Sequence, residues 1–130
     1  MLGLLRIVAG IVFVAAGTMK MFGFPPFPSW TPPADIPVPP MWEVKLAGIL
    51  EVYGGAAFTI GLLTRPVAFV LAGEMAVAYF QVHFPQSIYP NTNMGIPAVL
   101  YCFIFLYFVA AGAGAWSIDA LIARSRARRG

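Results

Sequence analysis

Few side chains in this sequence could take part in chemistry, and most of those fall inside long apolar runs. They comprise two acids, a lysine, a histidine and three neutral polar groups: Lys20, Glu51, Glu74, Gln81, His83, Asn93 and Tyr101. An ionisable group within an apolar run is costly to bury, so each one requires an explanation. Together they could form a polar site that binds a proton, a cation or the head of a polar ligand.

Glu51 lies seven residues inside its apolar run, which corresponds to a depth of about 10 Å along a helix. Gly48 and Gly55 share its helical face and would let a second helix come close to the carboxylate. Lys20 falls at a similar depth in the first run, three residues after Gly17. Because buried charges are normally paired, the sequence favours a structural ion pair between Lys20 and Glu51 over a catalytic pair.

Glu74 falls near the middle of its apolar run, and no basic residue in the other runs matches its depth. Gln81 lies on the same helical face, seven residues further on, and His83 lies near the outer end of the run. A carboxylic acid in this position could bind a proton, a cation or a polar ligand head. For Glu74 a functional and a structural interpretation are equally supported.

The chain has one cysteine, Cys102, and one histidine, His83. A cysteine-pair redox motif, a zinc cluster and a haem with two histidine ligands are therefore not expected. No nucleophile–base constellation is apparent either, so we expect no catalytic residue and no metal in a chain acting alone. His83 is expected to be a hydrogen-bonded residue at the membrane interface, and Cys102 to be a packing residue.

The elements that must position these groups follow from the composition. Of the 130 residues, 60% are hydrophobic and only 10% are charged, too apolar for a soluble domain of this size. Four apolar runs of about 20 residues, at 4–22, 44–63, 67–84 and 96–116, are each long enough for one helical crossing. We therefore predict an all-α fold, an integral membrane four-helix antiparallel bundle in a single domain.

The charges indicate the orientation of the predicted bundle. Arg6, Arg65 and the four arginines of the basic tail at 117–130 fall on one side, which the positive-inside rule assigns to the cytoplasm. Both termini are then cytoplasmic. Ser117 is expected to cap a short helix beginning at Ile118, and this tail is either an amphipathic helix at the membrane interface or a solvated topological signal. Half of the basic residues lie in this tail, which argues against nucleic acid as a partner.

The outer loop at 23–41 holds eight of the twelve prolines and cannot form a regular helix. Polyproline geometry or a folded cap on the outer surface fits it better. A competing interpretation of the first apolar run is a cleaved signal peptide. That interpretation is disfavoured, because cleavage would leave an odd number of crossings and place the arginine tail outside.

Several short segments, in order along the chain, resemble the DoxX-like family of small membrane proteins. They are Leu5-Arg6, Gly17-x-x-Lys20, Glu51-x-x-Gly54-Gly55, Gly61-Leu62-x-Thr64-Arg65-Pro66, His83-Phe84-Pro85, Leu100-Tyr101-Cys102 and Trp116-Ser117-Ile118-Asp119. The resemblance implies a four-helix protein of the bacterial inner membrane. This chain departs from the family at Ile96, where many relatives carry an acid. If that acid completes a polar site in the relatives, the site is altered here.

The family takes its name from a membrane-bound, quinone-reducing thiosulfate oxidoreductase, and its relatives are associated with redox complexes. The resemblance therefore implies an accessory or anchor subunit of a membrane redox assembly, with a quinone or a lipid held between its helices. Its partners would be the bilayer and a membrane-associated oxidoreductase or a second copy of the chain. If the protein takes part in catalysis, the resemblance implies that it does so as a subunit of a quinone-linked oxidoreductase. The alternative is a small transporter or ligand- or ion-binding membrane protein that uses Glu51 and Glu74.

Overall fold

The computed structural model describes residues 1–26 and 38–130. Within them all regular structure is helical, which confirms the all-α prediction. The elements are α1 (Leu2–Phe22), α2 (Met41–Ile49), η1 (Leu50–Gly54), α3 (Gly55–Ile60), α4 (Thr64–Ala78), η2 (Tyr79–His83), α5 (Ile96–Ala111) and α6 (Ile118–Ala127). Most of the proline-rich loop, for which polyproline geometry or a folded cap is predicted, lies outside the described residues.

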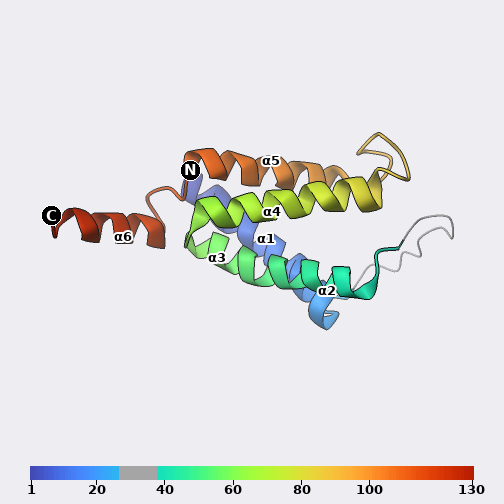
Figure 1. The fold of residues 1–130 in the computed structure, drawn as a ribbon, viewed down its shortest axis with the longest axis horizontal. Helices are drawn as coiled ribbons and strands as arrows, with labels where there is room; N and C mark the ends of the chain where they lie inside the picture. Colours follow the sequence, from blue (N-terminus) through green and yellow to red (C-terminus); the bar gives the residue numbers. More distant parts are fainter. Residues whose placement is uncertain (27–37) are drawn as a thin grey trace.

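The elements join into four helical rods and one projecting helix (Figure 1). The second rod runs without a break from α2 through the π-helical turn η1 into α3, and the third runs from α4 into the π-helical turn η2. The α1 helix packs against the second rod, and α4 packs along α5. Both termini lie at the same end of this arrangement, where α6 extends away from the rods (Figure 1).

Glycines allow α1 and the second rod to pack closely. A Cβ atom on Gly17 would lie 2.7 Å from the backbone nitrogen of Val52, and one on Gly10 would lie 3.1 Å from the Cα of Thr59. On the opposite rod, a Cβ on Gly48 would lie 3.2 Å from the Cβ of Lys20. The two backbones could not approach this closely with larger residues at these positions, as expected for helices that associate in lipid.

Aromatic rings from three rods form the centre of the core. The ring of Phe105 on α5 contacts Phe13 of α1 and Phe58 of α3 edge-on, with centroids 4.9 and 5.0 Å apart. Phe108, one turn further along α5, contacts Phe58 in the same manner at 4.9 Å. All four rings are buried. Edge-to-face packing adds to the stabilisation from burial, and these contacts link α5 to both α1 and α3.

The outward faces of the rods are apolar. Side chains along one face of α1 are about half exposed, including Leu4, Val8, Ile11 and Val12, and Phe69 and Phe103 are exposed on α4 and α5. Soluble proteins rarely expose such contiguous apolar surface. Leu2–Phe22 and Thr64–His83 are long and apolar enough to cross a membrane, while the apolar helix Ile96–Ala111 is shorter.

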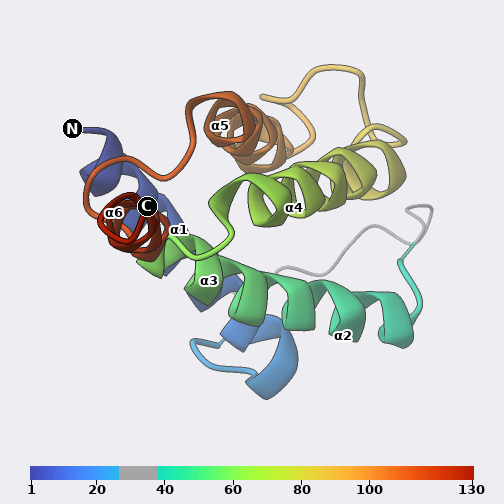
Figure 2. The same cartoon turned by 60° about the vertical axis from the view of Figure 1, so that its left-hand side comes forward.

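The α5 helix ends at Ala111, five residues before the end of the apolar run from which the fourth crossing is predicted. Gly112 and Gly114 follow with positive φ angles of 78° and 77°, which glycine adopts without strain because it has no Cβ. These two glycines redirect the chain toward α6, whose axis is seen end-on beside the ends of α1 and α3 in Figure 2. As predicted, α6 begins at Ile118, and Ser117 caps it by accepting a hydrogen bond from the backbone nitrogen of Ala120.

Candidate functional site

A cleft of about 450 Å³ lies between the second and third rods. The rods contact each other at α3 and η1 but diverge toward the ends formed by α2 and η2 (Figures 1 and 2). The walls of the cleft are mostly apolar, and its polar and aromatic lining consists of Lys20, Trp42, Glu43, Glu74 and Gln81. A mostly apolar cleft with a few polar groups is the usual form of a small-molecule site, so this cleft is the candidate functional site.

Lys20 and Glu51 form the ion pair predicted from their depths. The Lys20 ammonium donates to Oε1 of Glu51, and the Glu51 side chain is almost completely buried in the η1 turn. The close approach of α1 at Gly17 brings the two residues together, because a Cβ there would lie 2.8 Å from the Cβ of Glu51. Glu51 itself lies in a π-helical turn, a distortion that is frequent at functional sites.

Glu74 lines the cleft on the α4 side. Among the described residues, neither of its carboxyl oxygens has a hydrogen-bond partner, although both are shielded from solvent. Lys20 and Glu51 are close enough for their charges to act on it. A buried polar group without a partner is unfavourable, so Glu74 has an unused capacity to bind a donor or a cation.

Gln81 is held by a residue that the sequence analysis did not select. Its side-chain nitrogen donates to Oε2 of Glu43 at 2.6 Å, which joins η2 to α2 across the mouth of the cleft. Glu43 falls just before the second apolar run, where an acid is ordinarily a solvated end residue. Its only signal in the sequence is its position next to Trp42, an aromatic residue at the membrane interface.

His83, Asn93 and Tyr101 make contacts away from the cleft lining. Nδ1 of His83 lies 2.9 Å from the backbone oxygen of Asn93, whose buried side chain donates to the backbone oxygen of Ser87 and accepts from the backbone nitrogen of Gly95. These bonds shape the loop between η2 and α5. The Tyr101 ring packs in the core, 5.1 Å from the ring of Phe13. The cleft thus brings together Lys20, Glu74 and Gln81 of the predicted set, with the ion-pair partner Glu51 behind it.

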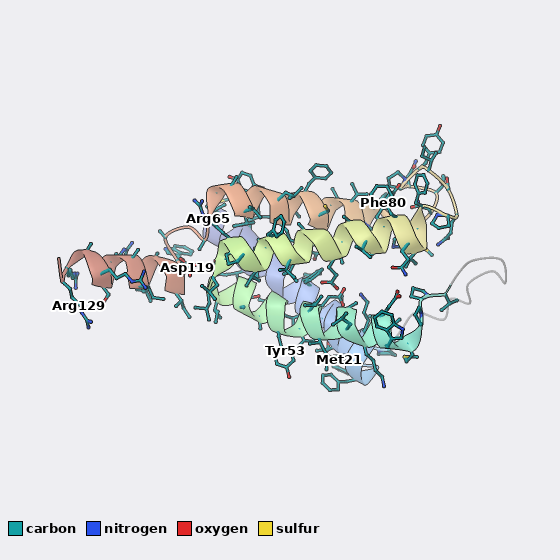
Figure 3. All side chains as sticks on the ribbon, viewed as in Figure 1. Met21, Tyr53, Arg65, Phe80, Asp119 and Arg129 are labelled. Carbon is teal, nitrogen blue, oxygen red and sulfur yellow. The ribbon has the colours of Figure 1, made fainter. Side chains whose placement is uncertain are left out.

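A second polar cluster lies at the opposite end of the rods, where the beginnings of α1 and α6 meet the turn between α3 and α4. Arg6 is 1% exposed and donates to the backbone oxygens of Phe58 and Trp116. Asp119, at the start of α6, accepts from the backbone nitrogens of Leu63 and Thr64 at 2.8 and 2.9 Å. Figure 3 shows Asp119 and Arg65 at this end, close to the start of α4.

The pKa of Asp119 results from opposing effects. Partial burial alone would raise it, but hydrogen bonds from Thr64 and Leu63 and the nearby Arg6 guanidinium outweigh burial and lower the pKa below its ordinary value. Asp119 is therefore the anionic cap of α4, where the helix dipole also favours negative charge. The sequence analysis used Arg6 for orientation and both residues for the family resemblance. It predicted no contact for either, because neither has a local partner.

Metal binding has no support within residues 1–26 and 38–130. No three side chains among the histidine, cysteine, aspartate and glutamate residues described there come close enough together to hold an ion. The arrangement at the cleft instead suits reversible binding, because it combines an ion pair, an unpartnered acid and apolar walls.

Comparison with known proteins identifies the family. The DoxX family matches residues 1–84. An uncharacterized protein of Haemophilus influenzae is 40% identical over 121 residues, covering 91% of this chain and 87% of the relative. The inner membrane protein YqjF of Escherichia coli K12 is 30% identical over 117 residues, covering 90% and 88%. No solved structure matches the chain.

Segments that carry the family resemblance meet in the second polar cluster. A Cβ on Gly61 would lie 1.8 Å from Nη1 of Arg6, and the backbone oxygen of Gly61 accepts from the backbone nitrogen of Asp119 at 2.9 Å. Three of the segments that carry the resemblance, Leu5-Arg6, Gly61–Pro66 and Trp116–Asp119, therefore contact one another in the folded chain. With the family match and the two relatives, they lead to one conclusion: the chain belongs to the DoxX family and is a protein of the bacterial inner membrane.

Proposed function

We propose that this protein crosses the inner membrane four times and binds a lipophilic molecule with a polar head in its cleft, as a non-catalytic subunit of a membrane redox assembly. The observation that carries the binding proposal is the cleft itself, an apolar space of about 450 Å³ with the unpartnered Glu74 in its lining. The redox part rests on the family to which the chain belongs.

The four-span arrangement is supported by the lengths of the rods and by their outward faces. The second rod is a continuous helix from Met41 to Ile60 and matches α1 and the third rod in extent. The α5 helix has 16 residues and spans about 24 Å, less than the roughly 30 Å of the hydrocarbon core. Gly112 and Ala113 follow it without helical structure, and both are buried in the protein, where non-helical backbone is tolerated at membrane depth.

The test is purification in a mild detergent, followed by mass spectrometry of the retained lipophilic molecules and proteins. Ala47→Phe places a ring in the cleft, and Ala110→Phe places the same ring on the exposed face of α5. We expect a small molecule enriched over bulk lipid in the natural protein and in Ala110→Phe but lost in Ala47→Phe, together with a co-purifying oxidoreductase. Identical bulk-lipid profiles in all three proteins, without a partner, would contradict the proposal.

A second candidate, a small transporter or ion-binding protein, is favoured by the same acids. Glu51 and Glu74 lie close enough to interact, and only Glu51 is paired with Lys20. Such a protein would move its ligand across sealed liposomes, and Glu74→Gln would abolish that movement. Retention of a ligand without flux would separate a binding subunit from a transporter.

A further inference from the structure

We infer that the ligand of the cleft is a lipophilic cation, an amphiphile whose ammonium head binds at Glu74, inside the mouth formed by Trp42 and Glu43, and whose tail follows the apolar walls. This inference rests on the proposed binding function and specifies the chemical class of its ligand. Three features carry it: the charge balance of the cleft, the exposed aromatic ring at its mouth, and the apolar walls between them.

The lining of the cleft contains two acids, Glu43 and Glu74, and one base, Lys20. Lys20 is the basic residue of the lining, and its charge is matched by Glu51, to which it donates. Glu43 and Glu74 remain, and the contact of Glu43 is with the neutral amide of Gln81. An ammonium head would be a partner for Glu74 and would favour its charged form, whereas an anionic head would disfavour that form.

Glu74 gives the head group a defined position. Its two oxygens are enclosed and have no hydrogen-bond partner among the described residues. Bonds to charged groups are the strong ones in proteins, and a buried acceptor left unpaired is costly. A cation therefore gains more at Glu74 than a neutral head of the same size, because it supplies both charge and donor.

Trp42 lines the mouth of the same cleft beside Glu43, and its side chain is largely exposed. The indole face is the best aromatic partner for a cation, and aromatic faces beside acids are a recurrent means of binding quaternary ammonium groups. Deeper in the cleft, Leu46, Leu50 and Val70 offer apolar surface for a tail. The cleft volume lies within the range of small-molecule sites, about 300–1,000 Å³.

The experiment uses Trp42 as the reporter. In a Trp30→Phe/Trp116→Phe background, the full chain is placed in micelles of dodecyl maltoside, an uncharged detergent without an ammonium group. Trp42 fluorescence is then titrated with dodecylammonium, whose head carries both a charge and N–H donors, or with dodecanol. We expect tighter binding of the cation than of the alcohol with the same chain length. Glu74→Gln should weaken cation binding about tenfold and leave alcohol binding unchanged, as expected for the loss of one charged contact. Glu43→Gln is a second near-isosteric variant for which we expect the same direction.

Ala47→Phe, which fills the cleft, distinguishes the outcomes. If the alcohol binds as tightly as the cation and both Gln variants leave binding unchanged, the cation inference is wrong while the binding function stands. If neither compound produces a response larger than that in Ala47→Phe, the proposed binding function itself is overturned. A preference for the cation that disappears in Glu74→Gln supports both.

Discussion

The side chain of Asp119 caps the helix that begins at Thr64, although 55 residues separate the two. Its Oδ2 accepts from the backbone nitrogen of Thr64 at 2.9 Å, and its Oδ1 accepts from that of Leu63 at 2.8 Å. The start of a helix leaves backbone donors without partners, and here an acid from another helix supplies the acceptors. The contact fixes the beginning of α6 to the turn between α3 and α4.

Asp119→Ala should destabilise the protein by about 1 kcal/mol, the usual cost of losing a helix cap. Asp119→Asn retains one acceptor oxygen and should fall between Ala and the natural residue. The measurement is the unfolding temperature in a mild detergent, followed by tryptophan fluorescence. Equal unfolding temperatures for all three proteins would show that the cap contributes nothing.

The same contact should make stability depend on pH in the acid range. Because the pKa of Asp119 is lower in the folded protein than its ordinary value of 3.8, the contribution is present above that value and is lost as the pH falls through the folded pKa. The difference in unfolding temperature between the natural protein and Asp119→Ala should be constant near neutral pH and shrink below about pH 4. A difference that grows on acidification would refute this assignment.

Gly61→Ala should be far more damaging than Gly73→Ala. Gly61 has a φ angle of 73°, and an added Cβ would lie 1.8 Å from the Arg6 guanidinium and 2.4 Å from the Cβ of Ser117. The left-handed backbone alone costs about 1–2 kcal/mol for alanine, before the clash is counted. Gly73 has no atom within 4 Å of the added carbon, so it is a matched control. We expect a sharp loss of folded protein for Gly61→Ala, measured by size-exclusion chromatography, and normal yields for Gly73→Ala.

Lys20→Met should leave the buried Glu51 without its cation and destabilise the protein by about 3–5 kcal/mol. Replacing both residues, as in Lys20→Met/Glu51→Leu, should recover most of this loss, because no unpaired charge remains. Lys45→Met removes an exposed lysine from α2 and is the control. The free energies of unfolding, measured by denaturant titration in mixed micelles, form a double-mutant cycle. The cycle also needs the single variant Glu51→Leu. If the loss of unfolding free energy in the double variant equals the sum of the losses in the two single variants, the two side chains are not coupled.

The four-span orientation predicts which cysteines a membrane-impermeant maleimide can reach. In a Cys102→Ser background, Asn91→Cys lies in the loop between η2 and α5, and Ser125→Cys lies on α6; both positions are exposed. In intact spheroplasts Asn91→Cys should react, while Ser125→Cys should react only after lysis. Labelling of both residues in intact spheroplasts would contradict a cytoplasmic C-terminus.

The sequence by itself determined the helical class, the membrane class and the ion pair, and its resemblance to the DoxX family indicated the inner membrane. Long apolar runs in a small chain leave few alternatives to helices. Lys20 and Glu51 lie at similar depths along their runs, and the nearby Gly17 and Gly48 let the two helices come close enough for the pair to form. The cap at Ser117 was equally readable, because the capping residue and the helix it begins are adjacent in the chain.

The tertiary structure alone decided which rods enclose a cleft and where the distant partners lie. The contacts of Arg6 with Phe58 and Trp116 join residues 52 and 110 positions apart, and no local periodicity relates them. The cleft depends on the divergence of α2 from η2, which brings Glu43 opposite Gln81 and leaves Glu74 without a partner among the described residues. Sequence gives the depth of a residue along its helix, but its neighbours around the bundle are set by packing between helices.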